Sequence, residues 1–116
     1  MLRDNLYHLV SIEKAEGACK ATVELIPGSE IYAAHFRGMP VTPGACLVGM
    51  VCELSAEALG HGCEISRADD IKFVRPVLPG ETSCLDFSMV FGDDSLVRAE
   101  ISDAGGLFAK MKIYLR

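Results

Sequence analysis

The sequence lacks several features that mark particular classes of protein. No C-x-x-C pair occurs among its five cysteines, and the odd number of thiols cannot all be paired in disulfides. Because extracellular disulfide scaffolds use paired cysteines, we expect reduced thiols and a cytoplasmic protein. The N-terminal stretch MLRDNLYHLVSIEKAEG carries Asp4 and has no long apolar run. We therefore expect no secretory signal there.

Long apolar runs and an excess of basic residues are also missing. The longest apolar segment, residues 45–52, is interrupted by Gly49 and is much shorter than the roughly 20 residues that a membrane-spanning helix needs. The formal net charge is −5, so the chain repels phosphate backbones and nucleic acid is not an expected partner. His8, His61 and Cys63 lack the spacing of metal ligands, and no metal site is predicted.

The sequence contains enough apolar residues to form one hydrophobic core. The chain has 116 residues, half of them apolar, which suits a single compact domain. Apolar residues, several of them alternating, and the glycine, proline and acidic turn signals between them predict six strands. These strands are expected at residues 5–14, 19–25, 64–74, 82–91, 95–102 and 107–115, and the short segment 30–34 is ambiguous.

Residues 45–59 are the one long helix that the sequence predicts. Thr42 is expected to cap its N-terminus, and Pro43 to occupy its first position, because proline lacks the N–H that would be unpaired there. Gly60 is a typical C-terminal stop.

The order of elements indicates the fold class. Glu53 and Glu57 are the only charges in the helix, so most of its sides are expected to be buried. Two strands, one long helix and about four antiparallel strands indicate an α+β fold in which a single sheet wraps a single helix. The sheet edges and the rest of the helix surface would need a partner, so a homodimer or higher homo-oligomer is expected.

Two positions beside the helix start could carry chemistry. Gly44 lies in the first turn, where backbone N–H groups and the helix dipole suit a developing oxyanion. A glycine there also lets a carbonyl come close, although Pro43 and Gly44 could simply shape the turn. His35 could act as a base near neutral pH, or be a loop histidine with a satisfied hydrogen bond.

Other candidates are more ambiguous. Glu53 shares one helix face with Gly49, and either belongs to a solvent stripe or points at His35 as a proton donor with a raised pKa. A small buried thiol is a simpler interpretation of Cys46 than a nucleophile. Lys72 and Arg75 form either a solvated edge or a phosphate contact.

Two motifs resemble a known family. Residues 35–44, HFRGMPVTPG, resemble the H-F-x-G-x-P-V-x-P-G motif of the 3-hydroxyacyl-acyl-carrier-protein dehydratases of fatty-acid synthesis. Residues 72–81, KFVRPVLPGE, are similar to the family's K-F-x-R-P-V-x-P-G-D segment. The resemblance covers essentially the whole chain. It implies the hotdog fold, a long central helix wrapped by an antiparallel sheet, as one domain over residues 1–116.

The resemblance also implies a mechanism. His35 would remove the proton next to the thioester carbonyl, and the Gly44 N–H would bind that carbonyl. A carboxylic acid on the helix of a second subunit would protonate the departing β-hydroxyl, without any cofactor. The substrate would ride on a phosphopantetheine arm in a tunnel at the dimer interface, with acyl-carrier protein as partner.

Further positions follow from the same resemblance. Those implied to line the substrate site are Phe36, Gly38, Pro43, Ala45, Gly49 and Phe73. Those implied to contact carrier protein or phosphate are Arg37, Lys72 and Arg75.

The helix departs from the family pattern at two positions. Gly49 stands where the family has its acid, and Glu53 stands where the family typically has a glutamine. The acid is therefore displaced by one turn, about 5.4 Å, or is lost. With the acid lost, the chain would be an acyl-binding module or the non-catalytic partner of an active dehydratase. A third possibility is thioester hydrolysis on the same fold.

Overall fold

The computed structural model describes residues 1–35 and 41–116, and of residues 33–35 it describes the backbone alone. Within this part of the chain, the strands and helices occur close to their predicted positions. In chain order they are β1 Tyr7–Ala15, β2 Ala18–Leu25, α1 Glu30–His35, α2 Gly44–Leu59, β3 Ile65–Phe73, β4 Cys84–Phe91, the 3-10 turn η1 Asp93–Ser95, β5 Leu96–Asp103 and β6 Gly106–Leu115.

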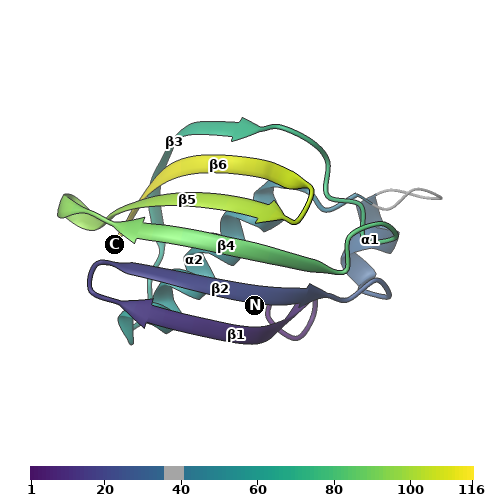
Figure 1. Cartoon of the computed structure of the whole chain (residues 1–116), viewed down its shortest axis with the longest axis horizontal. Helices are drawn as coiled ribbons and strands as arrows, with labels where there is room; N and C mark the ends of the chain where they lie inside the picture. Colours follow the sequence, from purple (N-terminus) through teal and green to yellow (C-terminus); the bar gives the residue numbers. More distant parts are fainter. Residues whose placement is uncertain (36–40) are drawn as a thin grey trace.

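The strands that the structure describes form one six-stranded sheet in the order β1-β2-β4-β5-β6-β3. Every neighbouring pair is antiparallel. The sheet curves around α2, and its two edges are β1 and β3 (Figure 1). This arrangement confirms the predicted α+β class and the hotdog architecture.

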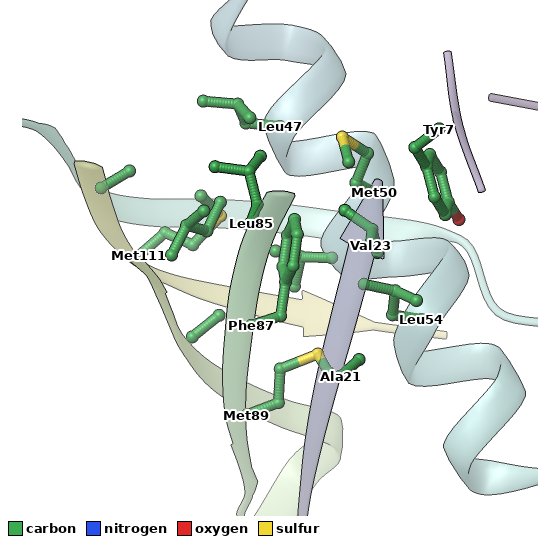
Figure 2. Packing of buried hydrophobic residues seen from close by; sticks show 14 of the residues in the cluster. Tyr7, Ala21, Val23, Leu47, Met50, Leu54, Leu85, Phe87, Met89 and Met111 are labelled. Atoms are coloured by element: carbon green, nitrogen blue, oxygen red, sulfur yellow. The ribbon is translucent and has the colours of Figure 1, made fainter. Parts of the chain in front are cut away.

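Helix α2 is held against the sheet by one apolar face. Leu47, Met50 and Leu54 recur at helical spacing, are almost fully buried, and point at the inner face of the sheet (Figure 2). They meet Val23 of β2 and Phe87 of β4, the two strands on which the helix packs. Burial of each large apolar side chain contributes roughly 1.5–3 kcal/mol, so the sheet fixes the position of the helix.

The two ends of α2 match the sequence prediction unequally. Gly60 ends the helix in the left-handed conformation at φ 80°, as predicted, and its N–H donates to the carbonyl of Ala56. Thr42 was predicted to cap the other end, and this is wrong. Pro43, predicted at the first helical position, is instead the residue before the first turn, and no side chain in the described ranges caps the helix. The Thr42 hydroxyl is instead 2.8 Å from the Tyr32 hydroxyl, a partner outside the helix.

The ambiguous segment 30–34 is helix α1. The Ser29 hydroxyl accepts the N–H of Ile31 at 3.3 Å, and Tyr32 is buried against the core. These two contacts stabilise a helix that is too short to persist alone.

The chain before β1 also departs from the prediction. The strand expected from residue 5 begins at Tyr7, because Asp4 takes the left-handed conformation at φ 66° and the chain turns there. In the described part of the chain, no helix is both long and apolar enough to cross a membrane.

Candidate active site

The predicted site involves the end of one helix and the start of the next along the chain. Helix α1 ends at His35 and α2 begins at Gly44. The His35 side chain lies outside the description, as do Phe36, Arg37 and Gly38 entirely. The predicted roles of these four residues therefore remain predictions.

A buried hydrogen bond joins α1 to the approach of α2. The hydroxyls of Tyr32 and Thr42 are 2.8 Å apart, and the two residues are 3% and 4% exposed. Burial raises the pKa of Tyr32 above its ordinary value, so the phenol stays protonated as a hydrogen-bonding group. The Thr42 N–H also donates to the Val77 carbonyl at 2.9 Å. Thr42 thus ties the start of α2 both to α1 and to the segment that follows β3.

Gly44 is the first residue of α2, where predicted. The N–H groups of Leu47 and Cys46 donate to the Pro43 carbonyl at 3.2 and 2.9 Å and begin the helical hydrogen-bond pattern. The amide of Gly44 belongs to the first turn, at the positive end of the helix dipole. The ring of Phe73 lies beside it. A Cβ on residue 44 would be 2.6 Å from the Phe73 Cζ, so glycine is the residue that fits under the ring.

An open groove runs beside this helix start. Its volume is about 370 Å³, and it lies between the first turn of α2 and the segment after β3. The lining residues are Val41, Thr42, Gly44, Leu47, Phe73, Val74, Arg75, Pro76 and Val77. A mainly apolar groove beside the first turn of a helix suits an acyl chain with a polar head.

Of the predicted phosphate contacts that the structure describes, Arg75 already has close partners. Its guanidinium pairs with the Asp103 carboxylate, donates to the Gly106 carbonyl at 3.1 Å, and lies 3.6 Å from the centroid of the Phe108 ring. Lys72 is exposed on edge strand β3. The two basic residues therefore differ: Arg75 binds the β5–β6 turn, whereas Lys72 is accessible.

Gly49 and Glu53 lie on one face of α2, as predicted, and that face meets the N-terminal segment. Both oxygens of Glu53 accept hydrogen bonds, Oε2 from the Leu2 N–H at 2.8 Å and Oε1 from the Arg3 N–H at 2.9 Å. The Tyr7 hydroxyl donates to Oε1 as well, at 3.1 Å. A Cβ on Gly49 would be 2.9 Å from Leu2 Cδ1.

Tyr7 and the thiols have shifted acidities. Burial, and next the negative charge of Glu53, raises the pKa of Tyr7 well above its ordinary value, so the phenol stays a donor toward the carboxylate. Burial also raises the pKa of the Cys46 thiol, which disfavours the thiolate that a nucleophile requires. The five cysteines, all within the described ranges, are unpaired thiols as expected.

The remaining histidines have local partners. His8 pairs with Asp4 at 3.0 Å, and His61 Nδ1 lies 3.7 Å from the Cys63 Sγ. Among the described residues, no group of three or more His, Cys, Asp or Glu side chains could hold a metal ion.

Leu2, Arg3 and Tyr7 were missed by sequence reasoning. They contact Glu53 across about 50 positions of the chain, and no local pattern marks them. The one available signal was the pair of departures from the family pattern, at Gly49 and Glu53, which share a helix face.

Comparison with known proteins gives a consistent family. The family model named ApeI-like, described as ApeI dehydratase, matches residues 11–110. The 3-hydroxyacyl-acyl-carrier-protein dehydratase FabZ of Herpetosiphon aurantiacus is 34% identical over 65 residues, which are 50% of this chain and 46% of that protein. The FabZ of Oenococcus oeni is 29% identical over 96 residues, which are 77% of this chain and 66% of that protein. The chain therefore spans between about half and two-thirds of the length of these curated relatives.

The fold has a counterpart among solved structures. A chain of the dehydratase heterocomplex ApeI:P from Xenorhabdus doucetiae superposes with a TM-score of 0.82 at 21% sequence identity. The match covers 94% of this chain and 96% of that one. The sequence comparisons and the fold comparison thus agree, because both match this chain to dehydratases with the hotdog fold.

Proposed function

Because this chain belongs to the ApeI-like dehydratase family, we propose that it converts a 3-hydroxyacyl thioester into the enoyl thioester with loss of water. The observation that carries this proposal is the start of α2. Gly44 presents a backbone amide at a helix N-terminus, next to an apolar groove and close in the chain to the end of α1 at His35. An acyl thioester needs these same elements, an oxyanion donor and an apolar channel.

The proposed chemistry is a β-elimination. His35 removes the proton on the carbon next to the thioester carbonyl, and the Gly44 N–H stabilises the negative charge that develops on the carbonyl oxygen. The electron pair then forms the carbon–carbon double bond as the β-hydroxyl leaves. Glu53 is the candidate donor of the proton that turns this hydroxyl into water. Its carboxyl lies one turn along α2 from the position where related enzymes are expected to carry their acid.

The proposal includes partners. The substrate would be carried on a phosphopantetheine arm, by acyl-carrier protein or coenzyme A, with Lys72 and Arg37 as the candidate contacts to its phosphate. A second copy of the chain is the proposed partner at edge strand β3, because Phe73 and the adjacent Val74 are each 51% exposed there. Pairing of two edges would cover these side chains and the open backbone groups.

The test follows product formation directly. Purified protein is incubated with 3-hydroxyacyl thioesters of several chain lengths on acyl-carrier protein and on coenzyme A, and the products are identified by mass spectrometry. We expect the enoyl thioester from the wild type. Loss of the base in His35→Ala is expected to lower the rate by about 100-fold or more. A wild type that converts no substrate on either carrier would refute the proposal, and release of a free thiol would indicate hydrolysis instead.

A second candidate function is supported by Gly49. Without an acid at this position the chain could bind an acyl group, or serve as the non-catalytic subunit of an active dehydratase. Introducing a carboxylic acid at position 49 distinguishes this candidate from the enzyme. Because Leu2 Cδ1 occupies the space beside Gly49, Gly49→Glu is combined with Leu2→Ala. Activity that appears in this double variant, and neither in the wild type nor in Leu2→Ala alone, would support the non-catalytic candidate and exclude Glu53 as a working donor.

A further inference from the structure

The N-terminal segment is bound closely to α2. Residues 1–7, the N-terminal strap, turn back on themselves, with the N–H groups of Asn5 and Leu6 donating to the Leu2 carbonyl at 3.0 and 2.7 Å. At its C-terminal end, Leu6 and Tyr7 are both 0% exposed and anchor the strap in the core.

Glu53 holds the other end of the strap. Its carboxylate accepts two backbone N–H groups, from Leu2 and Arg3, and the hydroxyl of Tyr7. Hydrogen bonds to an ionised acceptor are about twice as strong as neutral ones. The Arg3 guanidinium also lies 3.8 Å from Glu57, one turn further along the same face, in an exposed and hence weak pair.

The strap explains both departures of α2 from the family pattern. Leu2 packs onto Gly49, where a Cβ would already be 2.9 Å from its Cδ1, so a longer side chain at position 49 would displace it. A glutamine at position 53 would offer one acceptor oxygen and an NH₂ group, and the latter cannot accept the amide donors that a carboxylate accepts. A small residue at 49 and a carboxylate at 53 are thus the two requirements for docking this segment.

We propose that the N-terminal strap is a gate over the helix face at positions 49 and 53, and that Glu53 is its anchor. With the strap closed, both oxygens of Glu53 are occupied and Leu2 covers Gly49. Opening the strap releases these oxygens, so that the carboxylate can take up a proton from solvent and then donate it to the departing hydroxyl. This gating rests on the proposed function, whereas the anchoring does not.

The anchoring is tested by amide exchange in the full-length protein. Nuclear magnetic resonance follows hydrogen exchange at the backbone amides of Leu2 and Arg3. The proteins compared are the wild type, Glu53→Gln, and two variants of Arg3, to proline and to alanine. Arg3→Pro removes the N–H that bonds Glu53, whereas Arg3→Ala removes the side chain and keeps that N–H. We expect slow exchange in the wild type and in Arg3→Ala. Loss of one charge-assisted bond in Arg3→Pro is expected to accelerate exchange at Leu2 by about tenfold.

The gating is tested by the activity of the same variants. A strap that opens about ten times more often should raise kcat/KM by up to about tenfold in Arg3→Pro, with no change in Arg3→Ala. Tyr7→Phe, which removes the third hydrogen bond and keeps the buried ring, is a second opening variant in case the proline disturbs the turn.

Each remaining outcome is decisive. Wild-type exchange at Leu2 and Arg3 as fast as in an unfolded peptide would refute the anchoring. Faster exchange in both opening variants, with kcat/KM unchanged or lower, would refute the gating. If neither the wild type nor any variant converts substrate, the proposed function fails and the gating with it, while the exchange rates still decide the anchoring.

Discussion

The ring of Phe73 lies against Gly44, so close that a Cβ on residue 44 would be 2.6 Å from Cζ and 3.0 Å from Cε2. The contact joins the first residue of α2 to the last residue of β3. Within a single chain Phe73 is 51% exposed, so the ring can rotate away from the helix on its outer side. Access to the Gly44 amide therefore depends on the ring.

Gly44→Ala is expected to displace the Phe73 ring rather than to unfold the protein. An added methyl group cannot share the space with Cζ, but a half-exposed ring can move at a cost of about 1 kcal/mol. Activity is expected to fall by about tenfold or more, because the displaced ring and the new methyl group crowd the amide. Thermal unfolding and kcat/KM measure the two effects.

Phe73→Leu is the matched control for that variant. Combined with Gly44→Ala, it should restore part of the lost activity, since the smaller side chain leaves room for the methyl group. Additive losses in the double variant would show that the two residues do not interact in solution.

The Tyr32–Thr42 hydrogen bond is expected to hold the end of α1 in position relative to the start of α2. Tyr32→Phe would leave the buried Thr42 hydroxyl without this partner and is expected to cost about 1–3 kcal/mol of stability. Because α1 ends at His35, kcat should fall more than KM rises. Thr42→Ser keeps the hydroxyl and should retain most of the activity. Equal losses in the two variants would contradict a role for the bond.

Arg75 is expected to act on stability and not on carrier binding. Arg75→Lys loses the stacking on Phe108 and the forked contacts to Asp103 and Gly106, at a cost of about 1–2 kcal/mol in chemical denaturation. Lys72→Ala is the control, because the Lys72 side chain is exposed. This variant should leave the free energy of unfolding unchanged and raise the KM for a carrier-linked substrate. A large rise in KM for Arg75→Lys, with normal stability, would reverse the assignment.

Much of this fold follows from local sequence patterns. Alternation with period two marked several of the strands, because a half-buried strand selects its side chains by face. Together with the turn signals, it placed the strands to within about two residues. The end of α2 was predictable for the same local reason, since Gly60 adopts a conformation that other residues avoid. The start of α2 was not, because the Thr42 hydroxyl bonds Tyr32, a partner chosen by the tertiary structure.

Positions of the candidate site were predictable only where a sequence motif contains them. Gly44 was found by its place after a proline and before an apolar helix, and the structure has it at that helix start. The surroundings of Glu53 could not be foreseen, because its three donors lie 46 to 51 residues away in the sequence. The pairing of Arg75 with Asp103 depends likewise on how β6 pairs with β3 on one side and with β5 on the other.

Alkaline pH should destabilise the fold through Tyr7. Burial raises the pKa of its phenol in the folded state, so above about pH 10 the unfolded chain loses this proton while the folded chain keeps it. The unfolded state then binds fewer protons, and the free energy of unfolding falls by up to about 1.4 kcal/mol per pH unit for this group. Below that pH the contribution of Tyr7 is constant. Urea unfolding between about pH 8 and 11 under reducing conditions measures the slope, which should be shallower in Tyr7→Phe; an identical slope would mean that Tyr7 titrates normally in the folded protein.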